Sequence, residues 1–185
     1  KVDLKDVDGY EKWRNSNVYQ QKQEGLFSIG IKVRLGDFYT DKARKLASLI
    51  QRYAADELRL TLRQDILIRH VKADLLPLFY LELKELGFTD LGYNSTADIT
   101  ACPGTDTCNL GIASSTGIAE VLEKVLEEEY PQYRDNREVA IKISGCMNAC
   151  GQHNMAHIGF QGMSIRTKEK LVAPALQILL GGGVV

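Results

Sequence analysis

The four cysteines of this 185-residue chain are gathered in two closely spaced pairs. Cys102 and Cys108 enclose five residues, Cys146 and Cys150 enclose three, and 37 residues separate the two pairs. Thiolates are soft ligands, so four of them on short glycine-rich loops predict either a structural zinc ion or an iron–sulfur cluster. Both loops must then converge on one point, which constrains the fold more than any other feature of the sequence.

The spacing favours a cluster over zinc. Zinc sites usually use tight knuckles of two to four residues, whereas a cubane needs four thiolates spread around a larger body. A loop of five and a loop of three can supply that spread. Two disulfides are the remaining possibility, but they are typical of small secreted chains, and this chain is long enough for a core and begins with no signal-peptide pattern.

The sequence around the second pair is similar to a known family. Residues 145–153 (GCMNACGQH) and 158–162 (IGFQG), with the C-x5-C and C-x3-C spacing, resemble the nitrite/sulfite reductases that carry a [4Fe-4S] cluster bridged to siroheme. The resemblance implies that each of the four cysteines binds a cluster iron, and that the last one also ligates the siroheme iron. The metal ligands implied are Cys102, Cys108, Cys146 and Cys150.

Composition adds modest limits. A net charge of -1 gives no electrostatic argument for binding nucleic acid or an anionic membrane. No apolar run approaches the roughly 20 residues that a membrane-spanning helix needs. Clustered cysteines in a chain of otherwise average composition predict a reducing compartment, so we expect a cytoplasmic protein.

Hydrophobic periodicity predicts an α+β fold whose first part, residues 1–90, is a ferredoxin-like half-domain. Strand-helix-strand-strand-helix is the order of a split βαβ unit. The strands are expected at 26–35, 58–63 and 66–71, and the helices at 40–53 and 74–86. Residues 1–24 are polar apart from Trp13, and we expect a capping segment there.

The second part, residues 91–185, is predicted to be an α/β domain that binds the cluster and siroheme. A helix should begin between Asn109 and Thr116 and end before Pro131, with its positive N-terminal end toward the first cysteine loop. A strand at 139–143 should deliver Cys146 at its carboxyl end. A further strand at 155–165 and an apolar stretch at 173–180 follow.

Alternation in the strand at 58–63 places Arg59, Thr61 and Arg63 on one face. Guanidinium groups suit a carboxylate-rich tetrapyrrole, although a solvated polar face explains the same pattern. Residues 59–64 (RLTLRQ) resemble the R-x-T-x-R-Q segment with which these reductases approach siroheme. The resemblance therefore implies cofactor binding by Arg59, Thr61 and Arg63, together with Asn148 and Cys150 from the second cysteine loop.

The chain departs from the family at three positions. Pro is usual where Met147 stands, and Ser is frequent where Ala149 stands; neither position supplies a ligand. An arginine at position 63 is typical of the N-terminal repeat, whereas the cysteine set follows only in the C-terminal repeat, to which we assign the whole chain. One repeat is found, so we expect either a fragment, truncated at its C-terminus, or a single-repeat protein that pairs with a second copy of itself.

The resemblance implies part of an enzyme for the six-electron reduction of nitrite or sulfite, at a siroheme coupled through a cysteine thiolate to a [4Fe-4S] cluster. An electron donor such as ferredoxin or a flavoprotein is expected. Oxyanion-binding residues come mostly from the N-terminal repeat in this family, so we assign no catalytic residue here. An electron-transfer iron–sulfur module and a structural four-cysteine zinc domain remain alternatives, and either cofactor can be missing from the isolated chain.

Overall fold

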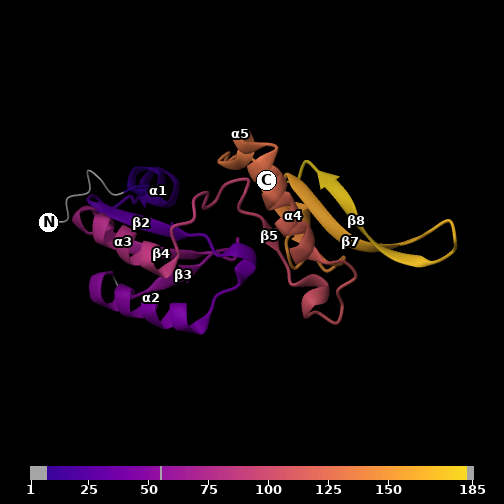
Figure 1. The fold of residues 1–185 in the computed structure, drawn as a ribbon, viewed down its shortest axis with the longest axis horizontal. Helices are drawn as coiled ribbons and strands as arrows, with labels where there is room; N and C mark the ends of the chain where they lie inside the picture. The colour runs from indigo at the N-terminus through magenta and orange to yellow at the C-terminus, as the bar shows by residue number, and fades with distance from the viewer. Residues whose placement is uncertain (1–7, 55, 183–185) are drawn as a thin grey trace. The chain divides into compact units, whose positions relative to one another are not determined.

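The computed structural model describes residues 8–54 and 56–182. The chain divides into two compact units, Lys1–Asn94 and Ser95–Val185, a division that falls four residues after the boundary expected from the sequence. Each unit contains one four-stranded sheet (Figure 1). Among the described residues, no helix combines the length and the apolar character needed to cross a bilayer.

The first unit is an antiparallel sheet with the strand order β1-β2-β4-β3. Its core fills the space between one sheet face and the helices, where isoleucines of β2 and β4 meet Leu46, Phe79 and Leu83. In chain order the elements are α1 (Tyr10–Asn17), β1 (Val18–Gln20), β2 (Leu26–Ile31), α2 (Thr40–Tyr53), β3 (Leu58–Leu60), β4 (Ile66–Lys72) and α3 (Leu76–Leu86).

Three expectations for this unit need correction. The segment expected to be a cap contains α1 and β1, and the Trp13 side chain is fully buried in the core; residues 1–7 lie outside the described part of the chain. The strand expected to reach residue 35 ends at Ile31, because Leu35 takes a left-handed conformation with φ 56° in a short turn. The strand expected at 58–63 ends at Leu60, where a hairpin turn begins.

The second unit is a mixed sheet with the strand order β5-β6-β7-β8. β5, β6 and β7 are parallel, and β8 returns antiparallel to β7 in the long hairpin drawn in yellow in Figure 1. Its elements are β5 (Thr100–Ala101), α4 (Ser115–Glu128), α5 (Pro131–Arg134), β6 (Ile141–Ser144), β7 (Ile158–Arg166) and β8 (Val172–Leu180). The helix predicted after Cys108 and the strand predicted before Cys146 are therefore both present.

Candidate metal centre

Both cysteine pairs begin at the same edge of the second sheet. β5 and β6 are parallel neighbours with Ala101 opposite Ile143, and Cys102 directly follows β5. The Cys102 N–H donates to the Ile143 carbonyl at 3.1 Å, so the first loop leaves the sheet beside the end of β6. Cys146 follows two residues after β6 ends. The carboxyl ends of adjacent parallel strands thus deliver both loops to one place, as expected for ligands in an α/β layer.

Glycine backbones hold the two loops against each other. A Cβ on Gly145 would lie 2.7 Å from the Gly104 Cα, and a Cβ on Gly111 would lie 2.7 Å from the Gly104 carbonyl carbon. Gly104 also has φ +52°, a conformation that favours glycine. The Ile112 and Ala113 N–H groups both donate to the Gly145 carbonyl, at 2.9 and 3.0 Å. Residues with side chains at these glycine positions would push the loops apart.

The first turn of α4 fixes the first cysteine loop. The Ser115 hydroxyl donates to the Cys102 carbonyl at 2.5 Å, and the Thr116 hydroxyl donates to the Asp106 carboxylate inside the loop. The Gly145 N–H donates to the Cys102 sulfur at 3.2 Å. Backbone donors to ligand sulfurs are among the features that set cluster reduction potentials. The second loop therefore already supplies a hydrogen bond to a thiol of the first.

The second cysteine loop folds back onto β6. The Gly151 N–H donates to the Ser144 hydroxyl at 3.0 Å, and a Cβ on Gly151 would lie 1.9 Å from the Ile143 carbonyl oxygen. Ala149 takes a left-handed conformation with φ 58°. This close return positions Cys150 at the end of the loop, where it is exposed.

Polar side chains behind this loop contact one another, and the sequence predicted a polar turn at Gln152 and His153 but not the part that Lys142 plays. Lys142 is buried on β6 and donates to the Gln152 side-chain carbonyl at 2.7 Å. His153 is also buried, with its Nε2 3.0 Å from the Gln161 side-chain oxygen. The alternation of Lys142 and Ser144 with isoleucines marks the face of β6 to which the loop returns, but a lone lysine in a strand carries no signal of this contact.

All four thiols are free: Cys102 and Cys146 are buried, and Cys108 and Cys150 are exposed. The disulfide alternative is therefore wrong for this structure. Among the described residues, no three His, Cys, Asp or Glu side chains gather closely enough to hold a single metal ion. A [4Fe-4S] cluster attaches each thiolate to a different iron, so its ligands stand farther apart than the four thiolates around one zinc.

The residues of the R-x-T-x-R segment lie in the first unit. Arg59 pairs with Leu67 of β4, which pairs with Gly30 of β2, so these three positions share the sheet face opposite the core. The Thr61 hydroxyl oxygen accepts the N–H groups of Arg63 and Asp65, both at 3.2 Å, and so stabilises the hairpin turn. Asn148 is exposed and belongs to the second unit.

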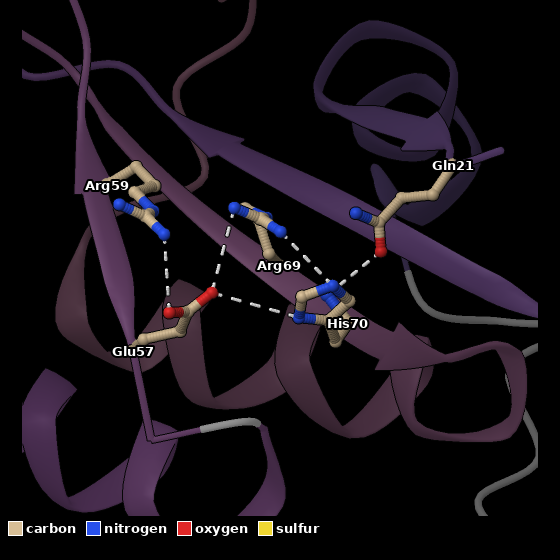
Figure 2. Close-up of polar contacts among 5 residues, drawn as sticks. All are labelled: Gln21, Glu57, Arg59, Arg69 and His70. Carbon is tan, nitrogen blue, oxygen red and sulfur yellow. Dashed lines mark hydrogen bonds and ion pairs between the residues drawn. The ribbon is translucent and has the colours of Figure 1, made fainter. Parts of the chain in front are cut away.

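Sequence reasoning missed a polar cluster around Arg59. Figure 2 shows that Glu57 lies between Arg59 of β3 and the Arg69–His70 pair of β4. Gln21, just after β1, contacts the backbone of His70. No sequence signal could have found this group, since it depends on the register of β3, β4 and β2.

Two family descriptions together match most of the chain. Residues 19–86 match the nitrite/sulfite reductase ferredoxin-like half domain, and residues 92–185 match the nitrite and sulphite reductase 4Fe-4S domain. The chain belongs to the nitrite and sulfite reductase family. This confirms the resemblance seen in the sequence, together with the α+β fold of a ferredoxin-like half-domain followed by a cluster-binding domain.

Relatives of this reductase-family chain include enzymes for both oxyanions. It is 31% identical over 175 residues to a ferredoxin–nitrite reductase of Synechococcus elongatus, covering 95% of this chain and 33% of that enzyme. It is 27% identical over 165 residues to a ferredoxin sulfite reductase of Mycobacterium tuberculosis, covering 88% and 30%. The chain thus spans about a third of the length of these relatives.

Solved structures agree with the family. The NirA protein of Mycobacterium tuberculosis superposes with a TM-score of 0.73 at 26% identity, over 91% of this chain and 31% of that one. A dissimilatory sulfite reductase I shares the fold, with a TM-score of 0.65 at 16% identity, over 87% and 39%. The relatives are oxidoreductases, and the family points to a [4Fe-4S] cluster and siroheme as cofactors.

The residues of the two cysteine loops fit a [4Fe-4S] cluster and siroheme. Four free thiols on two loops that touch through glycine backbones supply one ligand for each iron of a cubane. Large apolar side chains flank the thiols in sequence and are nonetheless exposed, a pattern that indicates a binding surface. They are Leu110, Ile112 and Met147, which are 67%, 40% and 76% exposed. The apolar face of a tetrapyrrole ring would cover such side chains, with its carboxylates at the rim left for polar partners.

Proposed function

We propose that this chain is the cluster-bearing, C-terminal part of a nitrite or sulfite reductase. In this proposal Cys102, Cys108, Cys146 and Cys150 hold a [4Fe-4S] cluster, and Cys150 also ligates the siroheme iron. The observation that carries the proposal is the contact between the Gly104 and Gly145 backbones, which joins the two cysteine loops at the carboxyl ends of the parallel strands β5 and β6.

The siroheme, when bound, would supply the iron at which the oxyanion is reduced by six electrons. The chain contributes ligands and orientation. The Gly145 N–H, which donates to the Cys102 sulfur, would stabilise the negative charge of that thiolate. Arg59 and Arg63 offer permanently charged donors for the carboxylates of the macrocycle, with Thr61 and Asn148 as hydrogen-bonding partners.

Ferredoxin is the donor that the names of the nitrite and sulfite reductase relatives support. Because the oxyanion-binding residues are expected in the N-terminal repeat, we propose that this repeat, or a second copy of the chain, completes the active site. Four free thiols agree with a reducing compartment, for which the cytoplasm remains our expectation.

Anaerobic purification, followed by metal analysis, visible absorption and electron paramagnetic resonance, tests the proposal. We expect about four irons and four acid-labile sulfides per chain, as a [4Fe-4S] cluster requires. Reconstitution with siroheme should add tetrapyrrole absorption bands and magnetic coupling between the two iron centres. One zinc per chain without iron would instead identify a structural zinc domain, and a cluster that never binds siroheme would identify an electron-transfer module.

Two variants sharpen the result. Cys102→Ser should lose the cluster, because it removes a ligand that the second loop already contacts. Met147→Leu, a change of similar volume inside the same loop, should keep it. Cluster content that is unchanged in Cys102→Ser would contradict the assignment of the four ligands.

A further inference from the structure

Two side chains of β6 hold the segment that follows Cys150. Lys142 and Ser144 stand two positions apart, so they share one face of the strand. The Ser144 hydroxyl oxygen accepts the Gly151 N–H at 3.0 Å. Lys142 Nζ donates to the Gln152 side-chain oxygen at 2.7 Å. The two residues directly after Cys150 are therefore bound, one each, by this face of β6.

The neighbouring strand β7 fixes the next residue, His153. Gln161 is the register partner of Ser144 on β7, and its side-chain oxygen lies 3.0 Å from His153 Nε2. Gly159 is the register partner of Lys142, and a Cβ there would lie 2.1 Å from the His153 carbonyl oxygen. The segment after the second cysteine loop thus lies directly against one face of the sheet.

The backbone around Cys150 needs these contacts. Ala149 and Gln152 have φ 58° and 60°, in the left-handed region that few non-glycine residues adopt. The Gln152 N–H donates to the Ala149 carbonyl at 2.7 Å and closes the turn between them. Such conformations persist where the surrounding structure holds them, and they cluster at functional sites. The position of the Cys150 sulfur therefore depends on what holds Gln152.

Lys142 is an unusual residue for this contact because it is only 9% exposed. Lysine is among the residues least often buried, since its ammonium group loses its hydration there. A neutral amide or hydroxyl could donate the same hydrogen bond to Gln152 without that loss. A buried lysine at this place therefore indicates that its charge, as well as its hydrogen bond, has a use.

A positive charge beside the cysteine loop acts on the charge of a cluster. Reduction by one electron from a ferredoxin-class donor makes a thiolate-ligated cluster more negative by one charge. A nearby ammonium group stabilises the reduced form more than the oxidised form, and the effect is strongest where solvent is excluded. Removing the ammonium group should therefore lower the reduction potential.

We propose that Lys142 is a positioning residue for Cys150, and that its charge also raises the reduction potential of the cluster. Gln152 transmits the positioning effect, since it connects the ammonium group to the turn that ends the second cysteine loop. Lys142 has this role only if Cys150 is a cluster ligand, so the role rests on the proposed function.

The test is a redox titration of the anaerobic, cluster-loaded chain, followed by electron paramagnetic resonance. Lys142→Met removes the charge and keeps a side chain of similar length. At a fixed ambient potential it should lower the ratio of reduced to oxidised cluster about tenfold, a shift of about 59 mV for one electron. Hydrogen exchange of the same samples tests positioning: a peptide over residues 146–153 should exchange about fivefold faster or more in Lys142→Met.

Two further variants separate this charge from charge in general. Lys142→Arg keeps a positive charge at the site, and its ratio of reduced to oxidised cluster should stay within about twofold of the parent chain. Lys168→Met removes the same charge from the exposed turn between β7 and β8. Its ratio should also stay within about twofold, because salt screens exposed charges. If Lys142→Met does not retain the cluster, Lys142→Gln takes its place, since an amide can still form a hydrogen bond in the buried site.

The parent chain distinguishes the failure of this role from the failure of the proposed function. A parent chain without a four-iron cluster would overturn both. A parent chain with the cluster, and an unchanged potential in the neutral Lys142 variant, would overturn the role of Lys142 alone. Equal shifts in Lys142→Met and Lys168→Met would overturn it as well. So would loss of the cluster from all three Lys142 variants, because Lys142→Arg retains the charge.

Discussion

At the scale of single residues, the candidate metal centre depends on glycines, because a Cβ atom at these positions would overlap neighbouring backbone atoms. The closest approach is at Gly151, where a Cβ would stand 1.9 Å from the Ile143 carbonyl oxygen. That oxygen belongs to the backbone of β6 and also accepts the Cys102 N–H, so it cannot retreat without disturbing the first cysteine loop. A methyl group added at Gly151 would therefore disturb both cysteine loops.

Gly151→Ala should destabilise the second unit by about 3 kcal/mol or more, because the backbone must shift to admit the new atom. Hydrogen exchange of peptides from β6 and the second cysteine loop measures the effect. Gly181→Ala is the matched control in the same unit. Gly181 has φ +82° and nothing within 4 Å of its Cβ position, so it should lose only about 1 kcal/mol from the backbone conformation. Equal losses of stability in the two variants would contradict a steric clash at position 151.

The raised pKa of Tyr10 predicts that the stability of the first unit depends on pH. Burial raises the pKa of the Tyr10 phenol above its usual value of 10.0, while the Arg14 charge opposes the shift and Glu11 adds to it. The folded state then holds the proton more tightly than the unfolded state, so stability is fully present below about pH 10 and falls as the pH rises through the folded pKa. Tyr10→Phe should show a smaller alkaline loss of stability in urea unfolding followed by Trp13 fluorescence. An identical alkaline loss in both proteins would contradict this account.

At the scale of elements, α4 presents its N-terminus to the first cysteine loop, and its capping residue is Ser114. The Ser114 hydroxyl oxygen accepts the Gly117 N–H at 3.2 Å. Ser114→Ala should cost about 1 kcal/mol, and hydrogen exchange should show faster opening of the first turn of α4. Ser48→Ala is the control, because the Ser48 hydroxyl donates to the Arg44 carbonyl inside α2 and its loss should be close to neutral. Unchanged exchange in the α4 first turn would contradict the capping role.

The limits of the longer helices could be predicted from the sequence. α2 begins at Thr40, and α3 ends before Gly87, which has φ 73°, as their end signals predicted. α4 begins inside the window set by its apolar stripe. These patterns work because the 3.6-residue period is produced directly by packing on one side of a helix.

Edge strands and bulges could not be predicted in the same way. Leu60 and Leu62 alternate like buried residues but are 80% and 75% exposed, because β3 is an edge strand that ends at Leu60 and Leu62 lies in the turn that follows. Leu35 and His70 take positive φ without being glycine. Alternation reports which residues share a face, but it does not report whether another element covers that face.

The same distinction applies to the candidate site: residue types could be predicted from the sequence, but contacts between strands and loops could not. Cysteine spacing predicts the candidate ligands, since metal-binding chemistry depends on residue type. The contact of Gly104 with Gly145, the hydrogen bond from Ser115 and the pairing of Arg69 with His70 depend on strand register, which sequence spacing alone does not determine.

At the scale of the whole molecule, the two units bury different kinds of side chain. The first unit has a core of large residues that includes Trp13, Phe79 and several leucines and isoleucines. The buried apolar residues described in the second unit are mostly small: Ala97, Ile99, Ala101, Ala113, Ala119, Ile141, Ile143 and Ala156, with Cys102 and Cys146. Small side chains bury less apolar area, and so contribute less to the free energy of folding. Metal binding in the second unit is therefore expected to supply a large share of its stability.

Cluster loss should accordingly unfold the second unit while the first unit stays folded. Hydrogen exchange of the anaerobic, cluster-loaded chain and of the chain after iron chelation measures this. We expect peptides from β6 and α4 to lose protection by about two orders of magnitude or more, since a bound metal centre contributes several kcal/mol to folding. Peptides from β4 and α3 should keep their protection and serve as the internal control. Equal loss in both units would show that they fold as one, and no loss in either would show that the small-residue core is sufficient without the cluster.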